Sequence, residues 1–99
     1  MNMQALMREA QKMQKELLKT QQELESKTYE GISSLVNVVV NGKNELVSVK
    51  INSDEDITKG DIELLEDMIL VAVNDAMKKA EAEKEKKLSK YGQGLAGLM

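Results

Sequence analysis

The sequence predicts one α+β domain in which a long N-terminal helix, a three-stranded antiparallel sheet and a long C-terminal helix follow one another. Three observations lead to this prediction. Residues 3–26 contain no Gly or Pro and consist largely of strong helix formers. Residues 28–51 are rich in β-branched side chains and are interrupted by glycine-containing turns. From residue 58 onward the apolar residues return to a helical spacing, which completes the order.

The first helix is expected from Met3 to Ser26, with a length of about 36 Å at roughly 1.5 Å per residue. Its apolar residues alternate at spacings of three and four, as in the seam of a coiled coil. They are Met3, Leu6, Ala10, Met13, Leu17 and Leu24, with Thr20 at the one polar position. Such a seam predicts packing against another helix.

Three β-branched segments are expected to form the strands, and they are Tyr29–Ile32, Leu35–Val40 and Leu46–Ile51. Asn41-Gly42 separates the second segment from the third, and this dipeptide is typical of a tight hairpin. In the third segment apolar and polar residues alternate along Val47, Ser48, Val49, Lys50 and Ile51. That alternation predicts a sheet with one covered face, for which the helices would supply the cover.

The second helix is expected to begin near Thr58, whose spacing to Asp61 resembles a capping box after the polar link 52–56. One side of this helix carries Ile62, Leu65, Ile69, Ala72, Ala76 and Ala80. The remaining circumference of its first half carries Leu64, Met68, Leu70, Val71 and Val73. A helix that is apolar nearly all round must be covered on two faces, so we expect a homodimer in which a second copy covers one of them.

Beyond Ala80 the helix becomes too polar to pack and is expected to project into solvent. We therefore place the single domain at residues 1–91 and a flexible, glycine-containing tail at residues 92–99.

The composition excludes several classes of function. The 99 residues include no Cys and no His, which removes disulfide frameworks, zinc ribbons, thiol nucleophiles and imidazole bases. No glycine-rich phosphate loop or nucleophile elbow is present, so we expect no enzyme activity, no cofactor, no metal and no small-molecule substrate. No apolar run approaches the roughly 18 residues that span a bilayer, so we expect a cytoplasmic protein without a membrane partner.

A calcium loop is the one metal site that the sequence suggests. Asn52, Asp54, Asp56 and Glu63 fall at positions 1, 3, 5 and 12 of an EF-hand-like loop. The sixth position requires Gly but holds Ile57, and the flanking segments are a strand and a helix. We therefore interpret these acids as residues near the positive end of the second helix.

A stripe of basic residues along the first helix is the main candidate binding surface. At about 100° per residue its members fall within roughly 60° of one another, nearly opposite the apolar seam. We call them the basic stripe, and they are Arg8, Lys12, Lys15 and Lys19. The stripe is ~16 Å long, enough to follow several phosphates. A solvated face is the simpler interpretation, since Glu9, Glu16 and Glu23 run alongside it.

The second helix offers a weaker basic set. Lys79, Lys86 and Lys90 share one face within about 40° by the same arithmetic, with Glu83 nearby. Any nucleic acid bound here should be a duplex, because two tyrosines are too few to form a stacking platform for single strands.

Three segments carry a resemblance to a known family, and they are MREAQKMQKELLKTQQELESKTYEG (7–31), VNVVVNGKNELVSVKI (36–51) and LLEDMILVAVNDAMKKAEAE (64–83). They resemble the YbaB/EbfC family of nucleoid-associated proteins over nearly the whole chain. The resemblance implies a tweezer-like homodimer whose helices project. It also implies that the protein binds double-stranded DNA with limited sequence selectivity. The implied location is the nucleoid in the bacterial cytoplasm, and the implied role is to regulate gene expression or to organise the nucleoid.

A different class of function remains open at this stage. A helix, a hairpin and a second long helix also describe prefoldin-like coiled-coil subunits, which act as protein-interaction or holdase modules. The acidic pI near 5.0 and the methionines of the helices favour this alternative. Against it, residues 80–90 have lost the a/d heptads that a coiled-coil arm would sustain.

Overall fold

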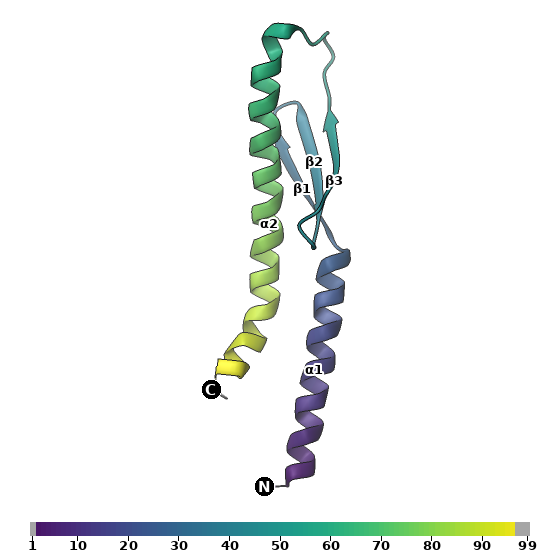
Figure 1. Ribbon diagram of the computed structural model, residues 1–99, viewed down its shortest axis with the longest axis vertical. Helices are drawn as coiled ribbons and strands as arrows, with labels where there is room; N and C mark the ends of the chain where they lie inside the picture. The colour runs from purple at the N-terminus through teal and green to yellow at the C-terminus, as the bar shows by residue number, and fades with distance from the viewer. Residues whose placement is uncertain (1, 97–99) are drawn as a thin grey trace.

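The computed structural model describes the backbone of residues 2–96, together with all their side chains except those of residues 90 and 92–96. The chain is elongated, with principal extents of 71 × 21 × 14 Å. Figure 1 shows the long C-terminal helix alongside a small sheet, with the N-terminal helix extending beyond one end of that sheet. The elements are α1 (Met3–Ser26), β1 (Thr28–Ser33), β2 (Val36–Asn41), β3 (Leu46–Ile51), the 3-10 turn η1 (Lys59–Asp61) and α2 (Ile62–Ala96). The predicted fold class and order of elements are confirmed.

The three strands form one antiparallel sheet in the order β1-β2-β3. Gly31 pairs with Val38, which pairs in turn with Val49, and a bulge lies between Val39 and Val40. The prediction that Leu35 begins the second strand is wrong. Leu35 lies in a two-residue turn because Ser33 already pairs with Val36, and the left-handed backbone of Ser34, at φ 51°, closes the connection.

The core is a single layer between α2 and the first two strands. Its fully buried side chains alternate along β2 and recur every fourth residue along α2, and they are Val36, Val38, Val40, Ala72 and Ala76. Alanine on the helix and valine on the strand allow a short distance between the two backbones. On β1 the buried Gly31 lies beneath α2, where a Cβ atom would overlap the carbonyl oxygen of Ala72. The helix therefore rests almost directly on the sheet.

The third strand is not covered as predicted. All six residues of β3 are exposed, because α2 lies over β1 and β2 and one helix does not reach across the third strand. Val47, Val49 and Ile51 retain 58%, 43% and 41% of their accessible surface. The apolar side chains of β3 are therefore left uncovered by the described part of the chain.

The second helix begins where its capping box was predicted. The backbone N–H and the hydroxyl of Thr58 both donate to Oδ2 of Asp61, at 2.9 and 3.0 Å. The carboxylate also lies at the positive end of the helix, and these hydrogen bonds lower its pKa. The helix continues through Ala96, past the domain boundary expected at residue 91. The side chains of residues 92–99 lie outside the described residues, so the flexible tail stays a prediction.

The first helix behaves as an arm. Leu24 is its only buried residue, and the sheet contacts it only near its C-terminal end. The predicted seam meets α2 at that end, where the hydroxyls of Thr20 and Tyr91 lie 3.2 Å apart. Toward the N-terminus the same seam lines an open apolar groove of about 440 Å³, in which Leu6 and Met13 remain 45% and 40% exposed.

Replacing Gly31 with Ala is expected to lower the free energy of unfolding by about 1–3 kcal/mol, because the added methyl group overpacks the contact with α2. Urea unfolding followed by circular dichroism at fixed protein concentration measures the change. Gly60→Ala is the matched control, because its methyl group would meet only the Thr58 hydroxyl at 3.7 Å. Equal losses in the two variants would contradict the close packing described for Gly31.

Candidate nucleic-acid interface

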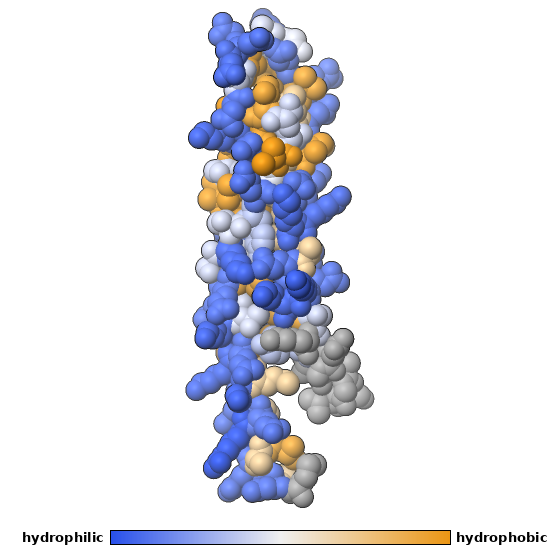
Figure 2. All heavy atoms as spheres, turned by 180° about the vertical axis from the view of Figure 1, so that it is seen from behind, coloured by the Kyte–Doolittle hydropathy of each residue, from blue (hydrophilic) through white to orange (hydrophobic). Residues whose placement is uncertain are grey.

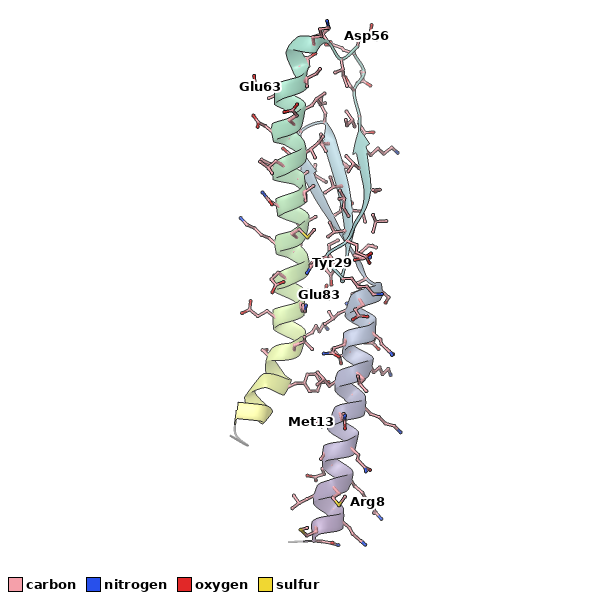
Figure 3. All side chains as sticks on the ribbon, viewed as in Figure 1. Arg8, Met13, Tyr29, Asp56, Glu63 and Glu83 are labelled. Carbon is pink, nitrogen blue, oxygen red and sulfur yellow. The ribbon has the colours of Figure 1, made fainter. Side chains whose placement is uncertain are left out.

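The basic stripe lies on the exposed face of α1. All four side chains are solvent-accessible, and Figure 3 labels Arg8 near the free end of the helix. The seam residue Thr20 contacts Tyr91 of α2, so the opposite face, which carries the stripe, is turned away from α2. The structure therefore brings the four predicted cations together on one outward face.

The stripe cations are not neutralised by ion pairs within the described part of the chain. The ion pairs found there join Lys27 to Glu83 and Lys79 to Asp75. Glu9 and Glu16, beside the stripe, are exposed and lie about 70–90° round the helix from the centre of the stripe. Four unpaired cations along ~16 Å form a surface that can contact a row of phosphates.

The second basic set, on α2, is not assembled in the same way. The ammonium group of Lys79 donates to the carbonyl oxygen of Glu30 at 2.9 Å and lies 3.2 Å from Oδ2 of Asp75. Lys86 is exposed, whereas the side chain of Lys90 lies outside the described residues. Lys79 is thus engaged by strand β1 and by Asp75 of its own helix.

A joint between the two helices was not predicted from the sequence. At the C-cap of α1, Nζ of Lys27 lies 2.6 Å from Oε1 of Glu83 on α2. The hydrogen bond from Lys27, and then that from Tyr29, lower the pKa of Glu83. Partial burial raises the pKa of Tyr29 to about 12, and its hydrogen bond to Glu83 adds to this effect. Figure 3 shows Tyr29 and Glu83 close together where the base of α1 meets α2.

The residues considered for a calcium loop do not form a metal centre. Asp56 lies in the connection after β3, and Glu63 lies on α2 (Figure 3). Among the described residues, no three acidic side chains are grouped so that they could hold a metal ion. Within the same residues, no helix is both long enough and apolar enough to cross a membrane.

The model of the YbaB/EbfC DNA-binding family matches residues 1–95. The chain belongs to the YbaB/EbfC DNA-binding family. A nucleoid-associated protein of Ligilactobacillus salivarius is 37% identical over 99% of this chain and 95% of its own length. Another, from Ruminiclostridium cellulolyticum, is 43% identical over 98% of this chain and 85% of its own length.

A solved structure supports the same fold. The crystal structure of an uncharacterized protein from Helicobacter pylori superposes with a TM-score of 0.69 at 25% sequence identity. The match covers 94% of this chain and 98% of that one. The family is one of DNA-binding, nucleoid-associated proteins rather than of enzymes.

The low pKa of Glu83 leads to a pH-dependent prediction. A carboxylate whose pKa is lowered in the folded state stabilises that state above its ordinary pKa, and the contribution is lost as the pH falls through the lowered value. Glu83→Gln is therefore expected to lower the thermal midpoint at pH 7 and to match the native protein only in acid, below the lowered pKa of Glu83. Thermal unfolding across a pH series measures this.

Glu81→Gln is the control for that series, because Glu81 is exposed on the same helix and forms no ion pair with a described residue. A gap between the native protein and Glu83→Gln that stays constant from neutral to acidic pH would contradict the assignment.

Proposed function

We propose that the protein binds double-stranded DNA as a homodimer, through contacts between the basic stripe of α1 and the phosphate backbone, at the bacterial nucleoid. The observation that carries this proposal is the exposed row of four cations on one face of the arm, which form no ion pair with the described residues. Lysine and arginine side chains that neutralise phosphates release condensed counterions, which makes such binding strong at low salt.

The net charge of −3 does not oppose this function, because the charges are distributed along the molecule. The acidic residues are densest around η1, where Asp54, Glu55, Asp56, Asp61, Glu63, Glu66 and Asp67 occur with a single lysine among residues 54–67. This region lies at one end of the long axis and the free end of α1 at the other (Figure 1). A duplex would therefore be attracted to the arm and repelled from the opposite end.

Limited sequence selectivity follows from the kind of contact available. Backbone contacts fix the position of a protein on DNA but do not distinguish base pairs. Tyr91 is buried and Tyr29 is partly buried and hydrogen-bonded, so neither side chain offers a free ring on which bases could stack. Membership in a DNA-binding family does not support the alternative function of a prefoldin-like coiled-coil holdase.

The homodimer is supported by the apolar surface that the chain leaves uncovered. Figure 2 shows apolar residues gathered over the half of the molecule that holds the sheet and the start of α2. On α2, Leu64, Leu70 and Val71 are 56%, 61% and 55% exposed, and all six residues of β3 are exposed as well. A second copy covering this surface would bury the apolar residues that α2 leaves exposed. The dimer would also present two basic stripes to one duplex.

Changing the four stripe residues to Gln is expected to weaken binding to a random-sequence duplex by more than tenfold at low salt and to flatten its salt dependence. Each phosphate contact that is lost should reduce the slope of log affinity against log salt by about 0.9. Fluorescence anisotropy of a labelled duplex across a salt series measures both quantities.

The matched control removes the same charge from exposed lysines elsewhere, by changing Lys43, Lys50, Lys59 and Lys78 to Gln. We expect it to retain most of the affinity. Equal losses in the two variants would show a general charge effect, and an absence of binding by the native protein at low salt would reject DNA as the partner.

Introducing charge into the uncovered apolar surface is expected to give monomers. The variant Val49→Glu/Leu70→Glu places carboxylates at positions that are already exposed in one chain, so the fold should survive while the dimer dissociates. Sedimentation equilibrium measures the mass. The control Leu18→Glu alters an exposed apolar residue of α1, outside this surface, and should remain dimeric. An unchanged mass for the double variant would place the interface elsewhere.

A further inference from the structure

The arm that carries the basic stripe is held only at its base. Leu24 is the one buried residue of α1, and N-terminal to Thr20 the apolar seam of the helix lines an open groove. The backbone hydrogen bonds within such a helix hold its residues in fixed positions relative to one another, so the helix moves as one unit. The direction of the arm must therefore be set at its last turn and at the residues that follow it.

One side of the base is formed by the tip of the β2–β3 hairpin. The backbone N–H of Gly42 donates to the carbonyl oxygen of Lys27 at 3.1 Å. A Cβ atom at Gly42 would overlap the carbonyl oxygen of Leu24 and would lie 2.8 Å from the Cα atom of Glu25. The hairpin backbone thus contacts the backbone of the helix directly, without a side chain between them.

The hairpin tip is itself fixed by local hydrogen bonds. Oδ1 of Asn41 accepts from the backbone N–H groups of Lys43 and Glu45, at 2.9 and 3.0 Å. Asn44 adopts a left-handed conformation with φ of 63°, which completes the tight turn. A hairpin tip held in this way limits how far the C-terminal end of α1 can move toward the sheet.

The other side of the base is formed by α2. The ion pair between Lys27 and Glu83 lies at the C-cap of α1, and the contact between Thr20 and Tyr91 lies two turns before it. The base of the arm is thus bounded by a backbone contact from the hairpin and by polar contacts from the long helix.

We propose that this joint, with Gly42 on one side and the Lys27–Glu83 pair on the other, is a positioning element that sets the angle at which α1 presents its cations to DNA. The inference rests on the proposed function. Arg8 lies about 24 Å from Leu24 along the helix, so a tilt of roughly 15° at the joint displaces it by about 6 Å. That displacement exceeds the roughly 3.4 Å axial rise between successive phosphates of one strand, so a small change at the joint takes the stripe out of register with the backbone.

The first test is Gly42→Ala, which forces the hairpin and the helix apart without removing any cation from the chain. We expect duplex affinity to fall by about tenfold. Gly31→Ala is the matched control, because it introduces an equally severe overlap in the core, remote from the arm. We expect that control to keep its affinity within about threefold at a temperature where both variants are folded by circular dichroism. Equal affinities for Gly42→Ala and the native protein would overturn the inference.

The arm angle can be read independently of DNA. The chain has no Cys, so Gln4→Cys and Glu85→Cys accept a pair of spin labels without side reactions. Labelled protein diluted with excess unlabelled protein reports the distance between α1 and α2 by pulsed electron resonance. Gly42→Ala should shift this distance by several ångströms, whereas Gly60→Ala, whose methyl group would meet only the Thr58 hydroxyl at 3.7 Å, should leave it unchanged. A distance that does not move in Gly42→Ala would overturn the inference, even if the native protein binds no DNA.

If Gly42→Ala does not fold, a charge swap between Lys27 and Glu83 tests whether the joint positions α1. Lys27→Glu and Glu83→Lys each break the ion pair and should change both the distance and the affinity. The double variant restores the pair with reversed charges and should recover both. Recovery of the distance without recovery of the affinity would identify Lys27 as a direct DNA contact and would overturn its positioning role.

Discussion

The close approach of α2 to the sheet is the constraint on which the rest of the molecule depends. The valines of β2, the alanine row of α2 and Gly31 bring two backbones together over a single layer of small side chains. The layer is narrow, so it occupies only one face of α2 and only two of the three strands. The remaining apolar surface follows directly, as does the need for something to cover it.

The same constraint separates the molecule into two parts, a body formed by the sheet and α2, and the arm formed by α1. Within the body, hydrogen-bonded strands and buried valines fix the relative positions of the elements. The arm has its own backbone hydrogen bonds but only one buried residue, so its helical form is local while its direction depends on a few contacts. Binding groups on such an arm are rigid relative to one another and are placed relative to the body by the joint at its base.

Much of this arrangement could be predicted from sequence because it depends on local spacing. The bounds of α1, the Thr58–Asp61 cap and the gathering of Arg8 with the stripe lysines all follow from helical period and capping chemistry. The Lys27–Glu83 pair could not be predicted in this way, because 56 residues separate its members and only the sheet brings them together. The exposure of β3 also depends on how far one helix extends sideways, which no alternation along the strand reveals.

The position of Lys79 has a consequence for the open sheet. A three-stranded sheet has two edges, and unpaired carbonyl groups along an edge invite strands from other molecules to add. The ammonium group of Lys79 occupies one such carbonyl, that of Glu30 on the edge strand β1. A lysine at an edge is a common natural defence against uncontrolled strand pairing. The side chain of Lys79, which the sequence offers as a DNA contact, thus engages a backbone acceptor of β1 that an added strand would otherwise use.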